Sequence, residues 1–188
     1  MKNLDDICVL TQPGRGWAGP GHWLTHWEES FPSFVRVEQT NWSQPVYAHW
    51  STRMSQYIAS ASKPVLLIGH SLGTSLITRW TFDQPELASR VIGALLAAPT
   101  DRDMVDGDPN SPVSGFGPML LEKMPFRSIV LASQNDPFVT LERAKLFAAA
   151  WGSWLVDAGS NGHLASAANL GVWPRGLLAL GQLLEGVE

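Results

Sequence analysis

The sequence predicts an α/β fold in which a doubly wound, mostly parallel six-stranded sheet carries helices on both faces. Short apolar segments alternate with segments of helical periodicity along all 188 residues. Hydrophobic residues make up 45% and charged residues 16% of the chain, which indicates a globular protein and excludes a disordered tail or a long coiled coil. At this length we expect one domain, residues 1–188, with a sizeable core.

Six segments are predicted strands because they are short, mostly apolar and bounded by Gly, Pro or polar turn residues. They are residues 7–12, 34–40, 65–68, 91–98, 128–133 and 153–156. In the second segment Val35 and Val37 alternate with Arg36 and Glu38, which predicts a half-exposed strand at the edge of the sheet.

Five longer segments are predicted helices, and they lie between the strands or after the last one. They are residues 20–30, 45–61, 72–82, 141–151 and 174–184. In the second helix Trp50, Met54 and Ile58 recur at helical spacing, and Pro45 lies in the first turn. Residues 101–125 are rich in Asp, Gly and Pro and are predicted to be irregular, with a short helix at 119–123.

Charge and cysteine content limit the expected partners and location. Thirteen Lys and Arg against 17 Asp and Glu give a net charge of −4, so we expect neither nucleic acid nor an anionic membrane as a partner. The lone Cys8 lies in an apolar run and is predicted to be a buried structural thiol. Because the first residues lack the apolar core of a signal peptide and no apolar run approaches about 18 residues, we expect a cytoplasmic protein.

Residues 69–73 read Gly-His-Ser-Leu-Gly and fit the pattern Gly-x-Ser-x-Gly between a predicted strand and a predicted helix. This context is typical of a nucleophile elbow, in which Ser71 stands exposed on a sharp turn above the sheet. Gly69 and Gly73 fit the pattern because side chains at those positions would clash in such a turn. Ser71 is therefore the candidate nucleophile.

A nucleophilic serine needs a base and an orienting acid, and in this topology the chain order is Ser, acid, His. His163 is the only histidine after Ser71, and it follows the last predicted strand. Asp136 follows the preceding strand directly and is the favoured acid. Asp101 or Asp103 after an earlier strand, and Asp157 on the last strand, remain as alternatives.

The glycine-rich loop after the first strand has two interpretations. Gly14, Gly16 and Gly19 match the spacing Gly-x-Gly-x-x-Gly, and Glu38 closes the second strand, as in a dinucleotide-binding site. Pro20 and Gly21 delay the helix that such a site requires. We therefore favour an oxyanion loop.

In that interpretation the backbone N–H groups of Leu72 and Arg15 hold the oxyanion. Gly14, Trp17 and His70 are candidate residues of a substrate pocket, while Trp23 is assigned to helix packing in preference to that pocket. No metal site or organic cofactor is expected, because residues 101–108 depart from the EF-hand pattern and no zinc or P-loop motif is present.

Taken together, these motifs resemble the small single-domain serine hydrolases of the retinoblastoma-binding-protein-9-like (YdeN-like) family. The resemblance covers nearly the whole chain. Its carriers are Pro13-Gly14, His22-Trp23-x-x-x-Trp27, the Gly-His-Ser-Leu-Gly motif, Ser133-x-Asn135-Asp136-Pro137, Ala150-Trp151-Gly152-Ser153 and Gly162-His163. It implies a compact α/β-hydrolase fold without a lid domain and a triad of Ser71, Asp136 and His163. One departure is Leu164-Ala165, where many bacterial members have a branched residue and Asn; it is expected to alter the support of the histidine loop.

We therefore expect a serine hydrolase, most simply a carboxylesterase for small acyl esters. Two alternatives stay open: a non-catalytic interaction module on a hydrolase scaffold, and a dinucleotide-binding protein. Sequence does not distinguish an esterase from an amidase, thioesterase or acyltransferase, and it gives no oligomeric state. The chain has little room for a lid, and the only candidate is the irregular segment 101–118, which is expected to wall one side of the pocket.

Overall fold

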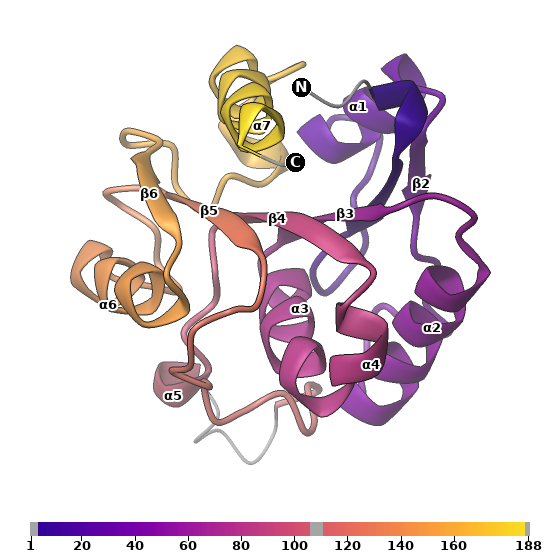
Figure 1. Ribbon diagram of the computed structural model, residues 1–188. Coiled ribbons are helices and arrows are strands. Elements are labelled where there is room, and N and C mark those ends of the chain that lie inside the picture. The colour runs from indigo at the N-terminus through magenta and orange to yellow at the C-terminus, as the bar shows by residue number, and fades with distance from the viewer. Residues whose placement is uncertain (1–3, 106–110, 187–188) are drawn as a thin grey trace.

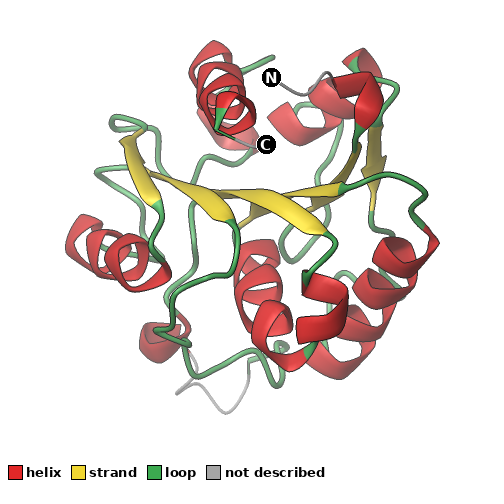
Figure 2. Cartoon of the chain, in the orientation of Figure 1, coloured by secondary structure: helices red, strands yellow, loops and turns green. Residues whose placement is uncertain are grey.

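A six-stranded sheet forms the centre of the molecule (Figure 1, Figure 2). The computed structural model describes residues 4–105 and 111–186. The strand order is β2-β1-β3-β4-β5-β6, and every neighbouring pair is parallel. The strands are β1 Cys8–Gln12, β2 Phe34–Arg36, β3 Val65–His70, β4 Val91–Ala97, β5 Arg127–Ala132 and β6 Trp154–Asp157.

Helices cover both faces of this sheet, as predicted (Figure 1). One face carries α1 and α7, and the other carries α2, α3 and α6. The helices are α1 Trp23–Ser30, α2 Tyr47–Ser60, α3 Leu72–Asp83, α4 Pro85–Ala88, α5 Arg102–Val105, α6 Leu141–Trp151 and α7 Pro174–Glu185. Two short 3₁₀ turns, Leu4–Asp6 and Ser166–Ala168, complete the described helical elements.

Alternation along the strands divides the core into two layers. Val65 and Leu67 of β3 pack in the cluster under α2, α3 and α6, whereas Leu66 and Ile68 pack in the cluster under α1 and α7. This follows from the two-residue period of a strand, because a sheet covered on both faces needs apolar side chains at every position. Each layer is filled by three buried tryptophans: Trp50, Trp80 and Trp151 in the first, and Trp23, Trp27 and Trp173 in the second.

The strand order also fixes where a site can form. From β1 the chain runs to β2 on one side and then returns to β3 on the other side of β1. The loops after β1 and β3 therefore leave the sheet in opposite directions, and a crevice opens between them at the carboxyl ends. Gln12 of β1 lies in register with Gly69 of β3, which brings the glycine-rich loop beside the Gly-x-Ser-x-Gly turn.

Several predicted elements need correction. The helix expected at 20–30 begins at Trp23, because Pro20 and Gly21 form a turn and His22 caps the helix. The helix expected at 119–123 is absent, and α4 and α5 are short helices that periodicity did not indicate. Cys8, expected to be buried, is half-buried.

The edge strand β2 is at the edge as predicted, but it is shorter than predicted. It ends at Arg36, so Val35 and Val37 do not share an environment: Val35 is 41% exposed and Val37 is fully buried. Val37 lies just beyond the strand, where its N–H donates to the Thr11 carbonyl and its side chain packs in the core layer under α2, α3 and α6.

Among the described residues, no helix is both long and apolar enough to cross a bilayer. Asp106, Gly107 and Asp108, which belonged to the rejected calcium-loop pattern, lie outside the described residues.

Helix α6 offers a test of local stability next to the site. Thr140 caps it by accepting a hydrogen bond from the N–H of Arg143. We expect Thr140→Ala to lower the free energy of unfolding by about 1 kcal/mol, because one helix donor loses its partner. Thr140→Ser keeps the capping oxygen, so its free energy of unfolding is expected to fall much less. Urea denaturation measures both values, and equal losses in the two variants would contradict the capping role.

Candidate active site

Ser71 sits at a strained turn between β3 and α3. Its backbone has φ 56° and ψ −125°, the left-handed half of the map that non-glycine residues rarely adopt. The Ser71 N–H donates to the carbonyl of Ala97 at the end of β4, and its carbonyl accepts from the Thr74 N–H. These bonds hold the turn, so the serine side chain leaves the sheet at its carboxyl edge.

The two motif glycines have the steric role that the sequence predicted. A Cβ on Gly73 would lie 2.1 Å from the carbonyl oxygen of Gln12, and a Cβ on Gly69 would lie 3.1 Å from the Thr74 nitrogen. Both obstacles are backbone atoms that cannot rotate away. The first turn of α3 is therefore pressed against the end of β1, which fixes the position of Ser71 relative to the neighbouring strand.

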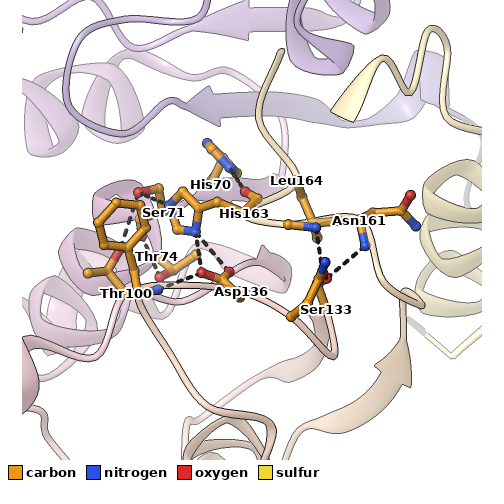
Figure 3. A network of polar contacts seen from close by, with 12 residues as sticks. His70, Ser71, Thr74, Thr100, Ser133, Asp136, Asn161, His163 and Leu164 are labelled. Atoms are coloured by element: carbon orange, nitrogen blue, oxygen red, sulfur yellow. Dashed lines mark hydrogen bonds and ion pairs between the residues drawn. The ribbon is translucent and has the colours of Figure 1, made fainter. Parts of the chain in front are cut away.

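Ser71, His163 and Asp136 form one hydrogen-bonded chain (Figure 3). The Nε2 of His163 lies 2.7 Å from the Oγ of Ser71, and its Nδ1 lies 2.8 and 2.9 Å from the two carboxylate oxygens of Asp136. An ionised carboxylate only accepts, so Nδ1 carries the proton and Nε2 is left to accept from the serine hydroxyl. The structure thus brings together the three residues that the sequence nominated.

The loop that carries His163 is held by two side-chain donors on the side of the sheet that α1 covers. The carbonyl of His163 accepts from the Nε2 of His70 at 2.8 Å (Figure 3), and the carbonyl of Leu164 accepts from the indole N–H of Trp23 at 2.9 Å. Leu164 itself is fully buried at φ 51° in the core layer beneath α1 and α7. The departure at this position thus supports the histidine loop by burial.

A second set of polar bonds joins the ends of β5 and β6. The side-chain oxygen of Asn135 accepts from the N–H of Gly162, and the Oγ of Ser133 accepts from the N–H of Asn161 (Figure 3). The N–H of Phe138 donates to Asp136, whose side chain is completely buried. Asp136 and His163 are therefore carried on one rigid unit.

The alternative acids are engaged elsewhere. Asp101 and Asp103 both pair with Arg143, at 2.5 and 2.6 Å. The Asp157 carboxylate accepts from the side chain of Gln134 and from the N–H of Gly159. Asp136 is thus the nominated carboxylate that reaches His163.

Two further histidines lie in the interior behind the site. Burial, followed by the charge of Arg36, lowers the pKa of His22 from 6.5 to about 4, and burial lowers the pKa of His70 well below its ordinary value. The rings of His22 and His70 meet edge to face, 4.7 Å apart. The neutral state is consistent with their bonds: the Nδ1 of His22 accepts from the N–H of Leu24, and His70 donates to a carbonyl.

The glycine-rich loop passes directly beside the serine. A Cβ on Gly14 would lie 2.7 Å from the Cβ of Ser71, so only glycine allows this approach. The Gly16 N–H is bonded to the Trp42 carbonyl, and α1 begins four residues after Gly19. The loop thus lacks the helix start that the dinucleotide interpretation requires, and Glu38 is exposed.

A cavity of about 360 Å³ opens at Ser71 and His163. Both nominated oxyanion residues line it: Leu72, which as the first residue of α3 has an N–H without an intrahelical acceptor, and Arg15. The three residues nominated for the pocket, Gly14, Trp17 and His70, are not in its wall. Trp17 is 47% exposed beneath the guanidinium of Arg36, and His70 is buried behind His163.

The remaining lining residues were not nominated from the sequence. They are Thr100, Arg102, Ser111, Pro112, Val113 and Phe138. The hydroxyl of Thr100 lies 3.1 Å from that of Ser71 (Figure 3). Thr100 and Phe138 could have been nominated from their positions, because both follow the end of a strand. Residues 111–113 agree with the expectation that segment 101–118 walls the pocket. Among the described residues no group of three His, Cys, Asp or Glu is arranged to hold a metal ion.

Residues 9–182 match the family model described as serine hydrolase. The chain belongs to the serine hydrolase family. A protein from Pectobacterium atrosepticum described as a YdeN-like hydrolase is 29% identical, with a TM-score of 0.85 over 96% of this chain and 92% of that one. This match confirms the resemblance to YdeN-like serine hydrolases. The protein is therefore a hydrolase.

More distant structures share the compact α/β-hydrolase fold. The ydeN gene product of B. subtilis is 17% identical, with a TM-score of 0.73 over 95% of this chain and 99% of that one. The esterase domain of a Rhodothermus marinus protein is 15% identical, with a TM-score of 0.66 over 93% and 86%. A comparison with curated proteins finds no significant match.

The close contact at Gly73 predicts a severe effect of a single methyl group. We expect Gly73→Ala to lower the free energy of unfolding by at least about 3 kcal/mol, because the added carbon overlaps the Gln12 carbonyl. The control is Gly181→Ala on α7, where a Cβ meets nothing within 4 Å and helix propensity predicts a gain of about 0.5–1 kcal/mol. Chemical denaturation tests the pair, and a mild loss in Gly73→Ala would contradict the described packing.

The neutral His22 predicts a dependence of stability on pH. Its folded pKa of about 4 lies below the unfolded value of 6.5, so the unfolded state binds more protons between these values and stability falls as pH drops. From pH 7 to pH 5 we expect a loss of about 2 kcal/mol from this group alone. The variant His22→Asn keeps an oxygen that can cap α1 but has no group that titrates in this range. Its loss of unfolding free energy from pH 7 to pH 5 is therefore expected to be smaller than that of the wild type.

Denaturation at the two pH values measures this difference. His49→Asn replaces an exposed histidine on α2 and is expected to keep the wild-type loss. Equal losses of unfolding free energy between pH 7 and pH 5 in His22→Asn and the wild type would show that His22 does not contribute to the pH dependence of stability.

Proposed function

We propose that this serine hydrolase is a carboxylesterase that cleaves small acyl esters through an acyl-enzyme on Ser71. The observation that supports this most strongly is the chain from Ser71 through His163 to Asp136 at the mouth of a cavity. The Nε2 of His163 is already within hydrogen-bond distance of the Ser71 hydroxyl, and its Nδ1 is within that distance of the Asp136 carboxylate.

In the first half of the reaction the Oγ of Ser71 attacks the ester carbonyl carbon while the Nε2 of His163 takes the hydroxyl proton. The buried carboxylate of Asp136 stabilises the imidazolium that forms. The negative charge on the former carbonyl oxygen is held by the N–H groups of Leu72 and Arg15, and each such donor contributes about 3 kcal/mol to the rate in comparable enzymes. When the tetrahedral intermediate collapses, the alcohol leaves with the proton from His163.

In the second half a water molecule gives its proton to His163 and attacks the acyl carbon. The second tetrahedral intermediate then releases the carboxylic acid, and the proton returns to Ser71. No step needs a group beyond the protein, the ester and water.

The dimensions of the cavity favour small substrates. About 360 Å³ is at the lower end of ordinary ligand pockets. Part of its wall comes from residues 111–113 of a loop, and no inserted helical domain is present among the described elements. We therefore expect short acyl chains and no activation at lipid interfaces, and a preference for emulsified long-chain lipids would contradict this proposal.

Hydrolysis of para-nitrophenyl butyrate tests the proposed roles. We expect Ser71→Ala and His163→Ala to lower kcat by at least about 10³-fold, and Asp136→Asn to lower it by about 10³- to 10⁴-fold through loss of the required tautomer. Asp157→Asn is the matched control, since this carboxylate faces Gln134 and Gly159. Undiminished turnover by Ser71→Ala, or a larger loss in Asp157→Asn than in Asp136→Asn, would contradict the assignment.

A further inference from the structure

The hydroxyl of Thr100 lies 3.1 Å from the Oγ of Ser71, and none of the proposed hydrolytic steps uses it (Figure 3). Thr100 lines the cavity and is 7% exposed. Thr74, which is also close to the nucleophile, donates its hydroxyl to the backbone carbonyl of Ser71. Within the described residues, Thr100 is thus the threonine whose hydroxyl reaches the reacting oxygen itself.

The direction of the hydrogen bond between the two hydroxyls follows from the partners of Ser71. The Nδ1 of His163 holds its proton against Asp136, so Nε2 accepts and the Ser71 hydroxyl donates to it at 2.7 Å. A hydroxyl has a single proton, so Ser71 has none left for Thr100. Thr100 therefore donates, and the Ser71 Oγ accepts on one lone pair and keeps the other for attack on a carbonyl carbon.

Backbone bonds on both sides of Thr100 fix its position after β4. The N–H of Ala98 donates to the Leu131 carbonyl on β5 at 2.8 Å. The N–H of Asp101 donates to the Phe138 carbonyl, in the turn after β5, at 3.0 Å. The threonine is therefore tied to the same strand end that carries the acid of the hydrogen-bonded chain.

The strand order separates Thr100 from the groups proposed to hold the oxyanion. β4 and β1 lie on opposite sides of β3, the strand that leads into Ser71. Thr100 follows β4, whereas the loop that carries Arg15 follows β1. The Thr100 hydroxyl therefore approaches the nucleophile from the β4 side and contacts its Oγ, while the oxyanion is held from the β1 side.

The hydrogen bond from Thr100 affects the two halves of the reaction differently, because their starting states differ. Before acylation the Ser71 Oγ already accepts from Thr100, so the bond is present both in the resting enzyme and in the transition state, and it changes the barrier little. In the acyl-enzyme the same atom is an ester oxygen, which accepts weakly because its lone pair is delocalised into the carbonyl. The bond strengthens again only as the Oγ leaves the acyl carbon and gains negative charge. An interaction that is stronger in the transition state than in the starting state accelerates that step.

We propose that Thr100 is a catalytic residue of deacylation, which donates a hydrogen bond to the Ser71 Oγ as this atom leaves the acyl carbon. This deepens the proposed esterase function and rests on it. In the step concerned, the oxygen of the attacking water is already bonded to the acyl carbon. The bond from that carbon to Oγ breaks, its electron pair goes to Oγ, and Oγ takes the proton from the Nε2 of His163. Thr100 keeps its own proton, and the products are the free serine and the carboxylic acid.

Hydrolysis of para-nitrophenyl butyrate allows the two halves of the reaction to be measured separately. The value of kcat/KM depends on the steps up to acylation and not on deacylation. Acid quenching at saturating ester, followed by intact-mass measurement, gives the fraction of the enzyme that is acylated during turnover. Dividing kcat by this fraction gives the rate constant of deacylation. Active sites are counted by fluorophosphonate labelling, so that misfolded protein does not enter either value.

The variant Thr100→Val replaces the hydroxyl by a methyl group of similar size. We expect its deacylation rate constant to fall by about five- to tenfold and its acylated fraction to rise, while kcat/KM changes by less than about twofold. Thr100→Ser keeps the donor, and its deacylation rate constant is expected to stay within about twofold of the wild type. The matched control is Thr81→Val, which removes a buried hydroxyl that donates to the Ile77 carbonyl near the far end of α3. This control is expected to keep both wild-type values.

Three results would overturn the proposal. An unchanged deacylation rate constant in Thr100→Val would reject a role for this hydroxyl in the step and leave the esterase function intact. Equal falls in kcat/KM and in the deacylation rate constant would show that Thr100 only positions Ser71. Wild-type protein that reacts with the fluorophosphonate but does not hydrolyse the ester would reject the esterase function and this inference with it.

Discussion

The strained turn at Ser71 is the constraint on which the rest of the site depends. A non-glycine residue with φ 56° is held there by bonds to β4 and by the packing of α3 against the end of β1. Because Gly73 has no side chain, the first turn of α3 can lie against the end of β1, and because Gly14 has none, the loop after β1 can pass beside Ser71. The parallel sheet makes this possible, since β1 and β3 are neighbours and end at the same edge.

The other two members of the hydrogen-bonded chain are positioned by different means. Asp136 is fixed by burial and by the turn that follows β5, whereas His163 is on a loop that would be mobile without partners. Its backbone is bonded to His70 on β3, and the next residue is bonded to Trp23 on α1. The buried His70 thus helps to fix the position of this loop. Because burial lowers the pKa values of His70 and His22, both histidines reduce the stability of the fold when pH falls.

The ends of the strands that carry the site, and the order of Ser71, Asp136 and His163, could be predicted from the sequence because both follow from local rules. An apolar run ending in Gly-x-Ser-x-Gly specifies the turn, and parallel strands bring their ends to one edge. Segment 101–118 was expected to wall the cavity, but its individual lining residues could not be predicted. Arg102 and residues 111–113 belong to a segment without periodicity, so only the folded chain places them beside Ser71.

Other differences have a similar tertiary origin. The loss of alternation at Val37 and the absence of a helix at 119–123 come from how the chain packs, which local propensity does not record. Trp17 was nominated for the pocket by its position in the loop, yet a backbone φ of 68° turns the chain and leaves the ring exposed beneath Arg36. In the same loop, Gly14 was also nominated for the pocket; it does not line the cavity, but it lies against Ser71, where a Cβ would clash.

The central claim is that the geometry around Ser71 makes its hydroxyl nucleophilic, and labelling with a fluorophosphonate tests this most directly. The reagent phosphonylates a serine only where a neighbouring base activates it. The account predicts one adduct per chain, located on the peptide that contains Ser71, and no adduct in His163→Ala under the same conditions. An adduct on a different residue, or none on wild-type protein with a folded circular dichroism spectrum, would contradict the account.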